Sequence, residues 1–434
     1  MYRAAIVTST LRQRIGAAVV TIALALVASS CSSGDQSSTT TTRSSDTSTA
    51  EPSSTTSTAP LTDPADLPAP KPFTGTLDEF YEVPEPLPQG QPGQLIRIMP
   101  VGEQAGQVVV RVMYHSRDVR DRDRAVTGTI SYPTAEAPEG GWPVVSWAHG
   151  TTGLAQQCAP SRFGAPGRSF GVEGVIAATD YIGLGPDGER HGYLSGTSEA
   201  HSVVDAVRAA RQLPDAYAGT TWVAAGHSQG GHSALFAHQL GKAYAPELQL
   251  KGTAAIAPAA MLTEIYGPAD EVIPRMVGLL AMFGWATDYP DLDLDEYLGA
   301  QAKARQDVVD SGCLMDIVEQ MVTIPPDELY AEDPQSTEPA ESIIDENDPG
   351  KVKVEAPLLL VYGTADTWVV PDRVKALFAR ECRIGQATEI VAVAGADHGT
   401  VVESDAIGPW LEQRLLGRPA KDGCSSGAAE SSSG

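Results

Sequence analysis

The sequence predicts an α/β fold, in which helices cover both faces of a mostly parallel sheet. From position 108 onward, short apolar runs typical of buried strands alternate with helical patterns, as in parallel sheets. The first two runs are adjacent and rich in β-branched residues, so we expect them to pair antiparallel. A glycine-rich turn joins the fifth run to the helical stretch that follows it.

Eight runs qualify as strands, at residues 108–114, 126–132, 144–147, 175–178, 222–225, 253–256, 358–362 and 390–393. The clearest helix between them is 198–213, where Val203, Val204 and Val207 share one face. Thr197 or Ser198 is expected to cap its start. A mostly parallel sheet of eight strands, with a sharp turn after the fifth, is the order of the α/β-hydrolase fold.

The turn at 226–230 reads GHSQG, a G-x-S-x-G pattern between an apolar strand and a helix with an apolar face. This is the context of a nucleophile elbow, which holds a serine on a tight, strained turn so that its hydroxyl projects above the sheet. The glycines fit because side chains two residues to either side of the serine would collide with neighbouring elements. An ordinary turn of small residues is the alternative, but the flanking strand and helix favour Ser228 as a nucleophile.

A nucleophilic serine needs a base, and the base needs an orienting acid. In this fold they follow in the chain order serine, acid, histidine. Asp366 comes after the seventh run in the sequence GTAD, and His398 comes after the eighth in ADHG. Both lie where open α/β sheets build their sites, so they are the predicted acid and base. Asp372 and Asp397 are the alternative acids.

Two backbone N–H groups are expected to form an oxyanion hole. One belongs to Gln229, directly after the nucleophile. The other lies in the loop AHGTTG after the third strand, where we choose Thr151 over its two neighbours; an ordinary glycine-rich turn is the alternative. Asp180 precedes Ser228 in the chain, so we expect it to tie its loop together. His227 is expected to pack against the site or line it.

Segment 259–354 is predicted to be a cap inserted after the sixth strand, because it is far longer than a connecting helix requires. Residues 261–285 are rich in apolar groups, whereas residues 288–350 hold 18 acids against Lys303 and Arg305. We expect the apolar part to line an acyl-chain pocket and the acidic part to stay solvated. A subdomain remote from Ser228 is the alternative.

Residues 1–30 are predicted to be an export signal of the lipoprotein type, because three arginines precede a 14-residue apolar run that is short for a membrane span. Cys31 follows a small residue, as in a bacterial lipoprotein box, although Ala28 departs from the larger aliphatic residue usual there. We expect Cys31 to carry a lipid anchor to a membrane, with simple secretion as the alternative.

Residues 31–70 are predicted to be a disordered tether rich in Ser, Thr and Pro, since 19 of the 29 residues at 32–60 are Ser or Thr. The catalytic domain is expected at 71–424. Residues 425–434 are expected to form a disordered tail.

Charge and cysteine content restrict the partners. The net charge is −25, and loss of residues 1–30 removes three arginines and no acids to give −28. This charge argues against nucleic acid and against attraction to anionic lipid headgroups. Besides Cys31 there are four cysteines, which predict two disulfides in one of three connectivities in an oxidising compartment. Neither CxxC nor HExxH occurs, so no metal and no cofactor are expected.

With these motifs in place, residues 75–424 resemble the secretory lipase family typified by Candida antarctica lipase A. The resemblance rests on HGTTG, TDYIGLG, GHSQGG, GTAD and DHG, and on CAPS at 158–161. CAPS and the position of the cap are more specific than the short motifs, which many α/β-hydrolases share. The resemblance implies an extracellular serine lipase or esterase whose cap bears a lid. Carried over, it implies a triad and two oxyanion donors at Ser228, Asp366, His398, Gln229 and Thr151.

The resemblance also implies the disulfide pairing. It implies Cys158–Cys313, which would brace the cap against the core, and Cys382–Cys424, which would pin the C-terminus. Two features depart from the family: the oxyanion loop reads His-Gly-Thr rather than the acidic version of the yeast lipase, and the cap is acidic. The length of the acyl chain is therefore not implied.

We expect an exported serine ester hydrolase, a lipase or carboxylesterase that cleaves small-molecule or lipid esters through a Ser-Asp-His triad and an acyl-enzyme intermediate. A serine peptidase or an acyltransferase on the same fold would use the same residues. A non-catalytic lipoprotein that binds lipid or cell wall is an alternative of a different class, and a probe for active-site serines separates it from the enzymes.

Overall fold

The computed structural model describes residues 63–186, 188, 190–266 and 272–427. The predicted export signal, Cys31 and most of the predicted tether lie outside these residues. Residues 63–70, the last of the predicted tether, lie on the body. Asp63 accepts two hydrogen bonds from Arg211, and Gln212 donates one to the carbonyl oxygen of Pro68.

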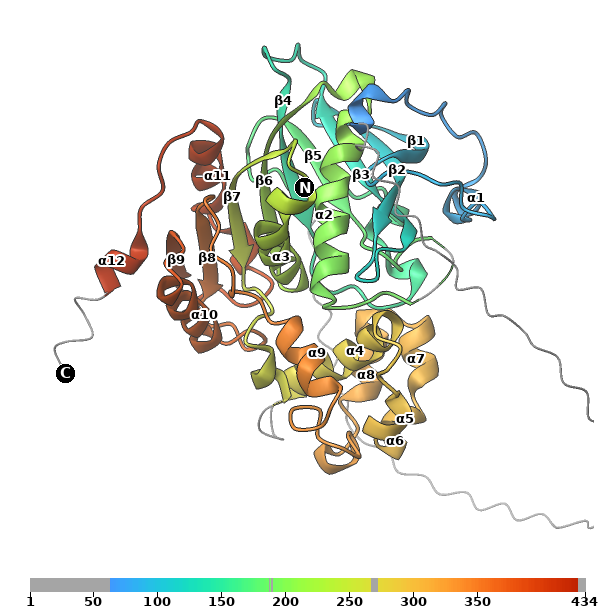
Figure 1. Cartoon of the computed structure of the whole chain (residues 1–434), viewed down its shortest axis with the longest axis vertical. Coiled ribbons are helices and arrows are strands. Elements are labelled where there is room, and N and C mark those ends of the chain that lie inside the picture. Colours follow the sequence, from blue (N-terminus) through green and yellow to red (C-terminus); the bar gives the residue numbers. More distant parts are fainter. Residues whose placement is uncertain (1–62, 187, 189, 267–271, 428–434) are drawn as a thin grey trace, which may run out of the picture. The chain divides into compact units, whose positions relative to one another are not determined.

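A nine-stranded sheet forms the centre of the body, in the order β1-β2-β3-β5-β4-β6-β7-β8-β9 (Figure 1). The strands are β1 (Leu95–Gln104), β2 (Gln107–Arg117), β3 (Asp123–Pro133), β4 (Trp142–Ala148), β5 (Val175–Thr179), β6 (Ala218–His227), β7 (Gln249–Ile256), β8 (Leu358–Gly363) and β9 (Thr388–Val393). The pairs from β1 to β3 and β3 with β5 are antiparallel, and all others are parallel. The predicted α/β fold with a mostly parallel sheet is confirmed.

All eight predicted strands are present, but the sheet has a ninth, β1, which the sequence analysis missed. This strand reads LIRIMPVGEQ and lies at the edge of the sheet, where β2 is its neighbouring strand. Its side chains are mostly half-buried or exposed, so it lacks the continuous apolar pattern that marks the interior strands. Pro100 within it is typical of an edge strand, because proline has no backbone N–H and one side of an edge strand needs no hydrogen-bond donors for a neighbouring strand.

Twelve α-helices accompany the sheet in the described part of the chain. They are α1 (Leu77–Tyr81), α2 (Gly196–Arg211), α3 (Gln229–Tyr244), α4 (Val272–Asp288), α5 (Leu294–Tyr297), α6 (Ala300–Lys303), α7 (Gln306–Ser311), α8 (Leu314–Met321), α9 (Ala340–Glu346), α10 (Pro371–Arg383), α11 (Ile407–Leu415) and α12 (Gly423–Gly427). None that the structure describes is both long and apolar enough to span a bilayer.

Successive strand residues are buried on opposite faces of the sheet. Ala224 of β6 packs in one cluster with α2 and α3, whereas Val223 packs in another with α11. Helix α10 covers the part of the first face that β8 contributes. The predicted helix 198–213 is α2, which begins at Gly196 after the N-cap Ser195. The predicted N-cap of this helix was wrong, because Thr197 and Ser198 lie inside the helix.

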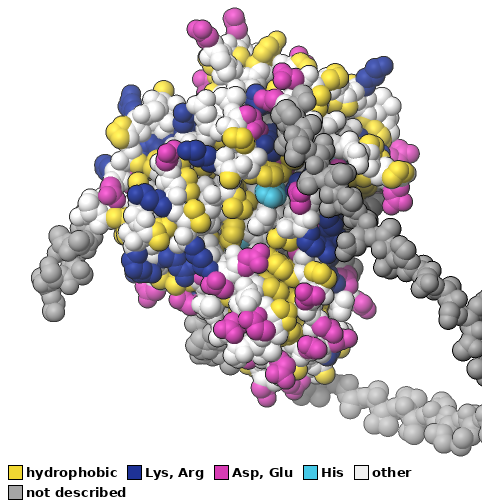
Figure 2. All heavy atoms as spheres, viewed as in Figure 1, with side chains coloured by type: hydrophobic (Ala, Val, Ile, Leu, Met, Phe, Trp, Pro, Cys, Tyr) yellow, Lys and Arg dark blue, Asp and Glu magenta, His cyan; other side chains and the backbone are white. Residues whose placement is uncertain are grey.

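Helices α4 to α9 follow β7 and precede β8 along the chain, so they form the segment predicted as the cap (Figure 1). The large apolar side chains of α4 are fully buried in the cap's own core: Leu279, Leu280, Met282, Phe283 and Trp285. Acidic side chains gather at the bottom of the view in Figure 2. In the predicted cap, Asp295, Glu319 and Asp327 are exposed. The expectation of a solvated acidic part is met at these residues.

Two disulfides join the pairs that the family resemblance implied, Cys158–Cys313 and Cys382–Cys424. The first links the loop after β4 to the start of α8 in the cap. Around it, Gly153 forms a bridge with Cys313, and Leu314 donates a hydrogen bond to the carbonyl oxygen of Thr152 (2.8 Å). The cap is therefore fastened to the loop that was predicted to supply an oxyanion donor.

The two disulfides should contribute unequally to stability. Cys158 and Cys313 are 155 residues apart in sequence and Cys382 and Cys424 are 42 apart, and a longer closed loop removes more entropy from the unfolded chain. Replacing Cys158 and Cys313 by Ser should lower the free energy of unfolding by about 1 kcal/mol more than replacing the other pair. Urea denaturation of both double variants measures this; an equal or smaller loss for the first pair would contradict it.

Candidate active site

Ser228 lies at the junction of β6 and α3 in a backbone conformation that L-residues rarely adopt, with φ 59° and ψ −119°. The turn closes so tightly that a Cβ on Gly226 would lie 1.9 Å from the carbonyl oxygen of Gly230. A Cβ on Gly230 would lie 1.9 Å from that of Ala148. Only glycine fits either position, as the sequence pattern predicted.

His398 and Asp366 complete a hydrogen-bonded chain with Ser228. The Nε2 atom of His398 lies 2.9 Å from Ser228 Oγ, and its Nδ1 atom lies 2.8 Å from Asp366 Oδ2. The buried Asp366 carboxylate also accepts backbone N–H bonds from Trp368 (2.8 Å) and Val369 (3.0 Å) at Oδ1. With both oxygens bound, the carboxylate is fixed toward the imidazole.

The two alternative acids point elsewhere. Asp397 is exposed and accepts hydrogen bonds from Gly399 and from the backbone and hydroxyl of Thr400. The bonds from Thr400 lower the pKa of Asp397. Asp372 is exposed on α10 and pairs with Lys375 at 3.0 Å. Of the three carboxylates considered from sequence, Asp366 is the one that contacts His398.

The residues predicted to supply the oxyanion donors lie beside Ser228. Thr151 follows β4, and its hydroxyl lies 2.8 Å from the hydroxyl of Tyr193. The backbone loop passes close to the nucleophile, since a Cβ on Gly150 would lie 3.5 Å from Ser228 Cβ. Gln229 is the first residue of α3, where a backbone N–H has no partner within the helix.

Two further histidines support the site in neutral form. His227 donates from Nε2 to the carbonyl oxygen of His398 (2.8 Å), and burial lowers its pKa to about 4. His149 donates from Nδ1 to the carbonyl oxygen of Gly150 (2.7 Å), and burial lowers its pKa as well. His227 therefore holds the main chain of the predicted base, in agreement with a packing role.

Two cavities of different character meet at Ser228. One has a volume of about 30 Å³ and lies beneath the cap, with a mainly apolar lining that includes Ala259, Ile265 and Val277. The other, of about 590 Å³, lies along the loops of Thr151 and Asp397, and polar residues such as Thr152 alternate in its lining with apolar ones such as Leu314. Of the apolar segment 261–285, Ile265, Ile273 and Val277 line the small cavity, whereas the large apolar side chains at 279–285 fill the cap core.

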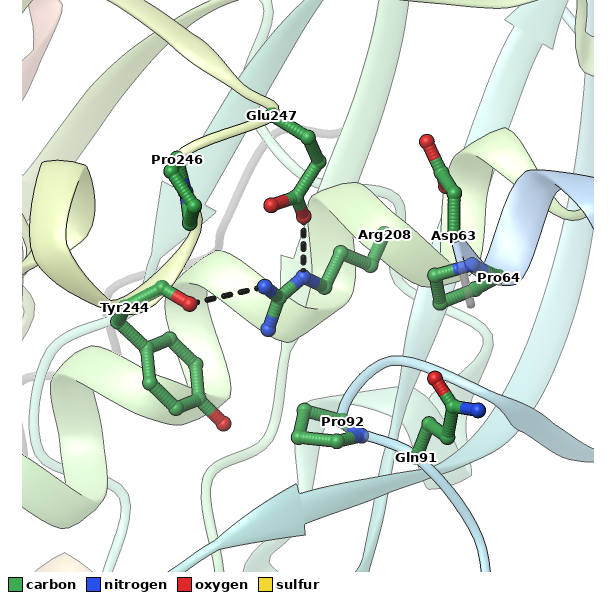
Figure 3. A pocket seen from close by; sticks show the side chains of 8 residues that line it. All are labelled: Asp63, Pro64, Gln91, Pro92, Arg208, Tyr244, Pro246 and Glu247. Carbon is green, nitrogen blue, oxygen red and sulfur yellow. Dashed lines mark hydrogen bonds and ion pairs between the residues drawn. The ribbon is translucent and has the colours of Figure 1, made fainter. Parts of the chain in front are cut away.

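A separate cavity, of about 320 Å³, lies at the C-terminal end of α2 (Figure 3). Arg208 crosses it and donates hydrogen bonds to Glu247 (2.7 Å) and to the carbonyl oxygen of Tyr244 (2.9 Å). This cavity contains none of the predicted site residues. Within the residues that the structure describes, no group of three or more His, Cys, Asp or Glu side chains could hold a metal ion.

Asp180 has the structural role expected of it. Its carboxylate accepts hydrogen bonds from the backbone N–H and hydroxyl of Ser161 and from the hydroxyl of Thr127. It thereby joins the loop after β5 to the CAPS segment, while burial raises its pKa.

Trp368 and Tyr193 are site residues that the sequence analysis missed. The Trp368 indole stacks on His398, with ring centroids 5.4 Å apart and planes 13° apart. Trp368 lines both cavities, and Tyr193 lines the small one. Neither position has a spacing signal, although Trp368 stands only two residues after Asp366.

The sequence is similar to those of known lipases. A family model described as "Secretory lipase" matches residues 171–423. Lipase 6 of Candida albicans is 24% identical over 400 residues, which are 80% of this chain and 83% of that protein.

Solved structures share the fold at low sequence identity. Candida antarctica lipase A aligns with a TM-score of 0.67 at 17% identity, over 84% of this chain and 89% of that one. The rice cell wall degrading esterase LipA from Xanthomonas oryzae aligns with a TM-score of 0.63 at 18% identity, over 76% and 99%. The predicted α/β-hydrolase fold is confirmed.

The hydrogen bonds of Asp366 predict the effect of an isosteric change on Ser228. In Asp366→Asn the amide oxygen can keep the two backbone bonds, which places the NH₂ group against His398 Nδ1. The imidazole then carries its proton on Nε2 and cannot accept one from Ser228. Labelling of Ser228 by a fluorophosphonate should slow by about 10³-fold or more.

Asp372→Asn, a change to an exposed carboxylate on α10, is the matched control and should label at the wild-type rate. Equal labelling of Asp366→Asn and the wild type would remove Asp366 from the site.

Proposed function

The chain belongs to the secretory lipase family and is an ester hydrolase of the lipase and esterase type, and on that premise we propose that it is an exported serine hydrolase acting through Ser228, His398 and Asp366. The observation that carries the proposal is the unbroken hydrogen-bonded chain from Asp366 through His398 to a serine held at positive φ.

Ser228 Oγ attacks the ester carbonyl carbon while His398 Nε2 takes the hydroxyl proton. Asp366 keeps the Nδ1 proton of His398 pointed toward itself and stabilises the imidazolium that forms. The carbonyl oxygen becomes an oxyanion, which the N–H groups of Gln229 and Thr151 bind; each such donor contributes on the order of 10²–10³ in rate.

Collapse of the tetrahedral intermediate breaks the bond to the alcohol. His398 gives its proton to the departing alcohol oxygen, and an acyl ester remains on Ser228. Water then attacks this ester while His398 takes one of its protons, and the second collapse returns that proton to Ser228 Oγ as the carboxylic acid leaves. Every proton taken by His398 is returned within the cycle, so no cofactor is required.

We assign the two halves of the ester to the two cavities at Ser228. The acyl group stays on the enzyme until water arrives and is apolar, so it belongs in the small apolar cavity beneath the cap. The alcohol has to leave directly into solvent, so it belongs in the much larger cavity along the loops of Thr151 and Asp397. The small cavity has room for about two or three water-sized groups, which favours short acyl chains.

Export is the second part of the proposal. The family is described as secretory, and two disulfides fit an oxidising compartment. Residues 1–30 then act as the signal, and lipidated Cys31 anchors the chain to a membrane through the Ser/Thr-rich tether.

The initial rate of hydrolysis of p-nitrophenyl esters of increasing acyl length tests both the chemistry and the acyl cavity. The mature protein should hydrolyse the short esters, from the acetate to the butyrate, fastest. It should lose activity beyond about eight carbons, because a cavity of about 30 Å³ is too small for a longer acyl chain. Ser228→Ala should abolish hydrolysis at every length.

Full activity in Ser228→Ala would refute the mechanism. A maximum at long chains would instead show that the apolar cavity extends under the cap when substrate binds.

A further inference from the structure

Both residues proposed as oxyanion donors form side-chain hydrogen bonds with one short segment, residues 191–199. This segment follows β5 and includes the first turn of α2. The hydroxyl of Tyr193 lies 2.8 Å from that of Thr151. The side-chain amide nitrogen of Gln229 lies 2.7 Å from His191 Nε2 and 2.7 Å from Glu199 Oε1. Gln229 and Glu199 are fully buried and line neither cavity at Ser228, so the contact between these two lies outside the space that substrate enters.

Glu199 is the centre of this arrangement because its carboxylate accepts four hydrogen bonds. Oε1 accepts from the backbone N–H of Leu194 (3.0 Å) and from Gln229, and Oε2 accepts from His232 Nδ1 (2.9 Å) and Ser233 Oγ (2.7 Å). Three of these donors are side chains from the first two turns of α3, the helix that begins directly after Ser228. The Glu199 carboxylate on α2 therefore binds the N-terminal part of α3 through three side-chain hydrogen bonds.

The partners of each group fix its protons. His232 faces Glu199 at Nδ1 and the carbonyl oxygen of Asn347 at Nε2 (2.8 Å), so both of its nitrogens have an acceptor to serve. His191 donates from Nδ1 to the carbonyl oxygen of Ile182 (2.7 Å), which leaves the lone pair of Nε2 to accept from Gln229. Burial lowers the pKa of His191, in agreement with a neutral ring.

Glu199 is ionised in this setting. Burial by itself would raise the pKa of Glu199, but the hydrogen bond and charge of His232 and the bond from Ser233 outweigh it and hold the pKa below its usual value. The His232 ring lies directly against this carboxylate, with Nδ1 2.9 Å from Oε2. An anion without such a partner beside an oxyanion hole would oppose the negative charge that develops during attack.

The amide of Gln229 is held by its nitrogen alone. Its two hydrogens meet Glu199 and His191, whereas its oxygen is buried and finds no donor among the residues that the structure describes. Because the side chain and the backbone N–H belong to one residue at the first position of α3, fixing the amide also fixes the direction of that N–H. Glu199 thus acts on the oxyanion through Gln229 and not by contact with substrate.

We propose that Glu199 is a positioning residue for ester hydrolysis, which sets the oxyanion hole by anchoring the side chain of Gln229. The inference rests on the proposed function, since it assigns a supporting part to the same reaction. Misplacing a group in an active site by about 1 Å can cost about 10²-fold in rate, so loss of the anchor should appear in kcat. KM should change little, because Glu199 lines neither cavity at Ser228.

The test compares Glu199→Ala with Glu199→Gln in the mature protein, using p-nitrophenyl butyrate. Glu199→Ala should lower kcat about 10²-fold with KM within about threefold. It should weaken inhibition by phenylboronic acid, which forms a tetrahedral anion on a reactive serine, by a similar factor.

Glu199→Gln should restore kcat to within about threefold of wild type. Its amide oxygen can accept from Leu194 and Gln229, and its NH₂ group can donate to a neutral His232. Gln229→Met, which removes the anchored amide and keeps the backbone N–H, should repeat the loss in kcat and inhibitor affinity even if Glu199→Ala folds poorly.

Asp205→Ala is the control for losing a buried carboxylate from α2. Asp205 is as buried as Glu199 and forms hydrogen bonds with Ser116, Tyr244 and Arg208. The last two residues line the cavity of Figure 3. Asp205→Ala should lower the melting temperature without lowering kcat.

The inference is overturned if Glu199→Ala and Gln229→Met lose only stability, as Asp205→Ala does, or if kcat falls while the boronic acid binds unchanged. Absence of Ser228-dependent hydrolysis in the wild type would instead refute the proposed function, so the two failures are distinguishable.

Discussion

The backbone of Ser228 is the constraint around which the rest of the structure is arranged. A serine at φ 59° is strained, and it persists only because its surroundings leave no alternative. Its N–H bonds to Ile256 of β7 (2.9 Å), and its carbonyl oxygen accepts from His232 and Ala259 (both 3.1 Å). Gly226 and Gly230 allow strand and helix to meet without a Cβ between them. The hydroxyl is left facing the sheet edge where the loops after β4, β8 and β9 also end.

That edge explains why residues distant in sequence meet. Parallel strands place their carboxyl ends together, so Thr151, Asp366 and His398 arrive from three different strands. The cap reaches the same edge by contacts on the segment before α2. Trp285 donates to the carbonyl oxygen of Leu194 (2.9 Å), and Asn347 Oδ1 accepts from the backbone of Gly196 (2.7 Å). The cap thus contacts residues 191–199, the segment that binds the side chains of the oxyanion donors. The position of the cap and the geometry of the oxyanion hole therefore both depend on this segment.

The parts that could be predicted from sequence are those with a local or ordered signal. Interior strands have continuous apolar runs, and the turn at Ser228 has its glycines. Asp366 and His398 follow from chain order because topology brings the ends of β8 and β9 together. The edge strand β1 was missed because an exposed strand containing Pro100 has no such run. Glu199 was missed for a different reason: on the helical pattern it is one acid in a first turn, and only tertiary packing shows that four donors converge on it.

The pair of Glu199 and His232 is better explained by orientation than by stability. Removing two charges from water costs several kcal/mol per ion, and a buried pair often does no better than apolar side chains of the same size. Such apolar side chains would pack α2 against α3 equally well, but they would leave the amide of Gln229 with the bond to His191 alone, and one bond holds its direction less firmly than two. A carboxylate with two oxygens can bind Gln229 at one oxygen and His232 with Ser233 at the other. These bonds fix α3 relative to α2, both about the axis of α3 and along it. His232 lies against this carboxylate, with Nδ1 2.9 Å from Oε2, and the backbone N–H groups that face the oxyanion hole are the donors that stabilise its negative charge.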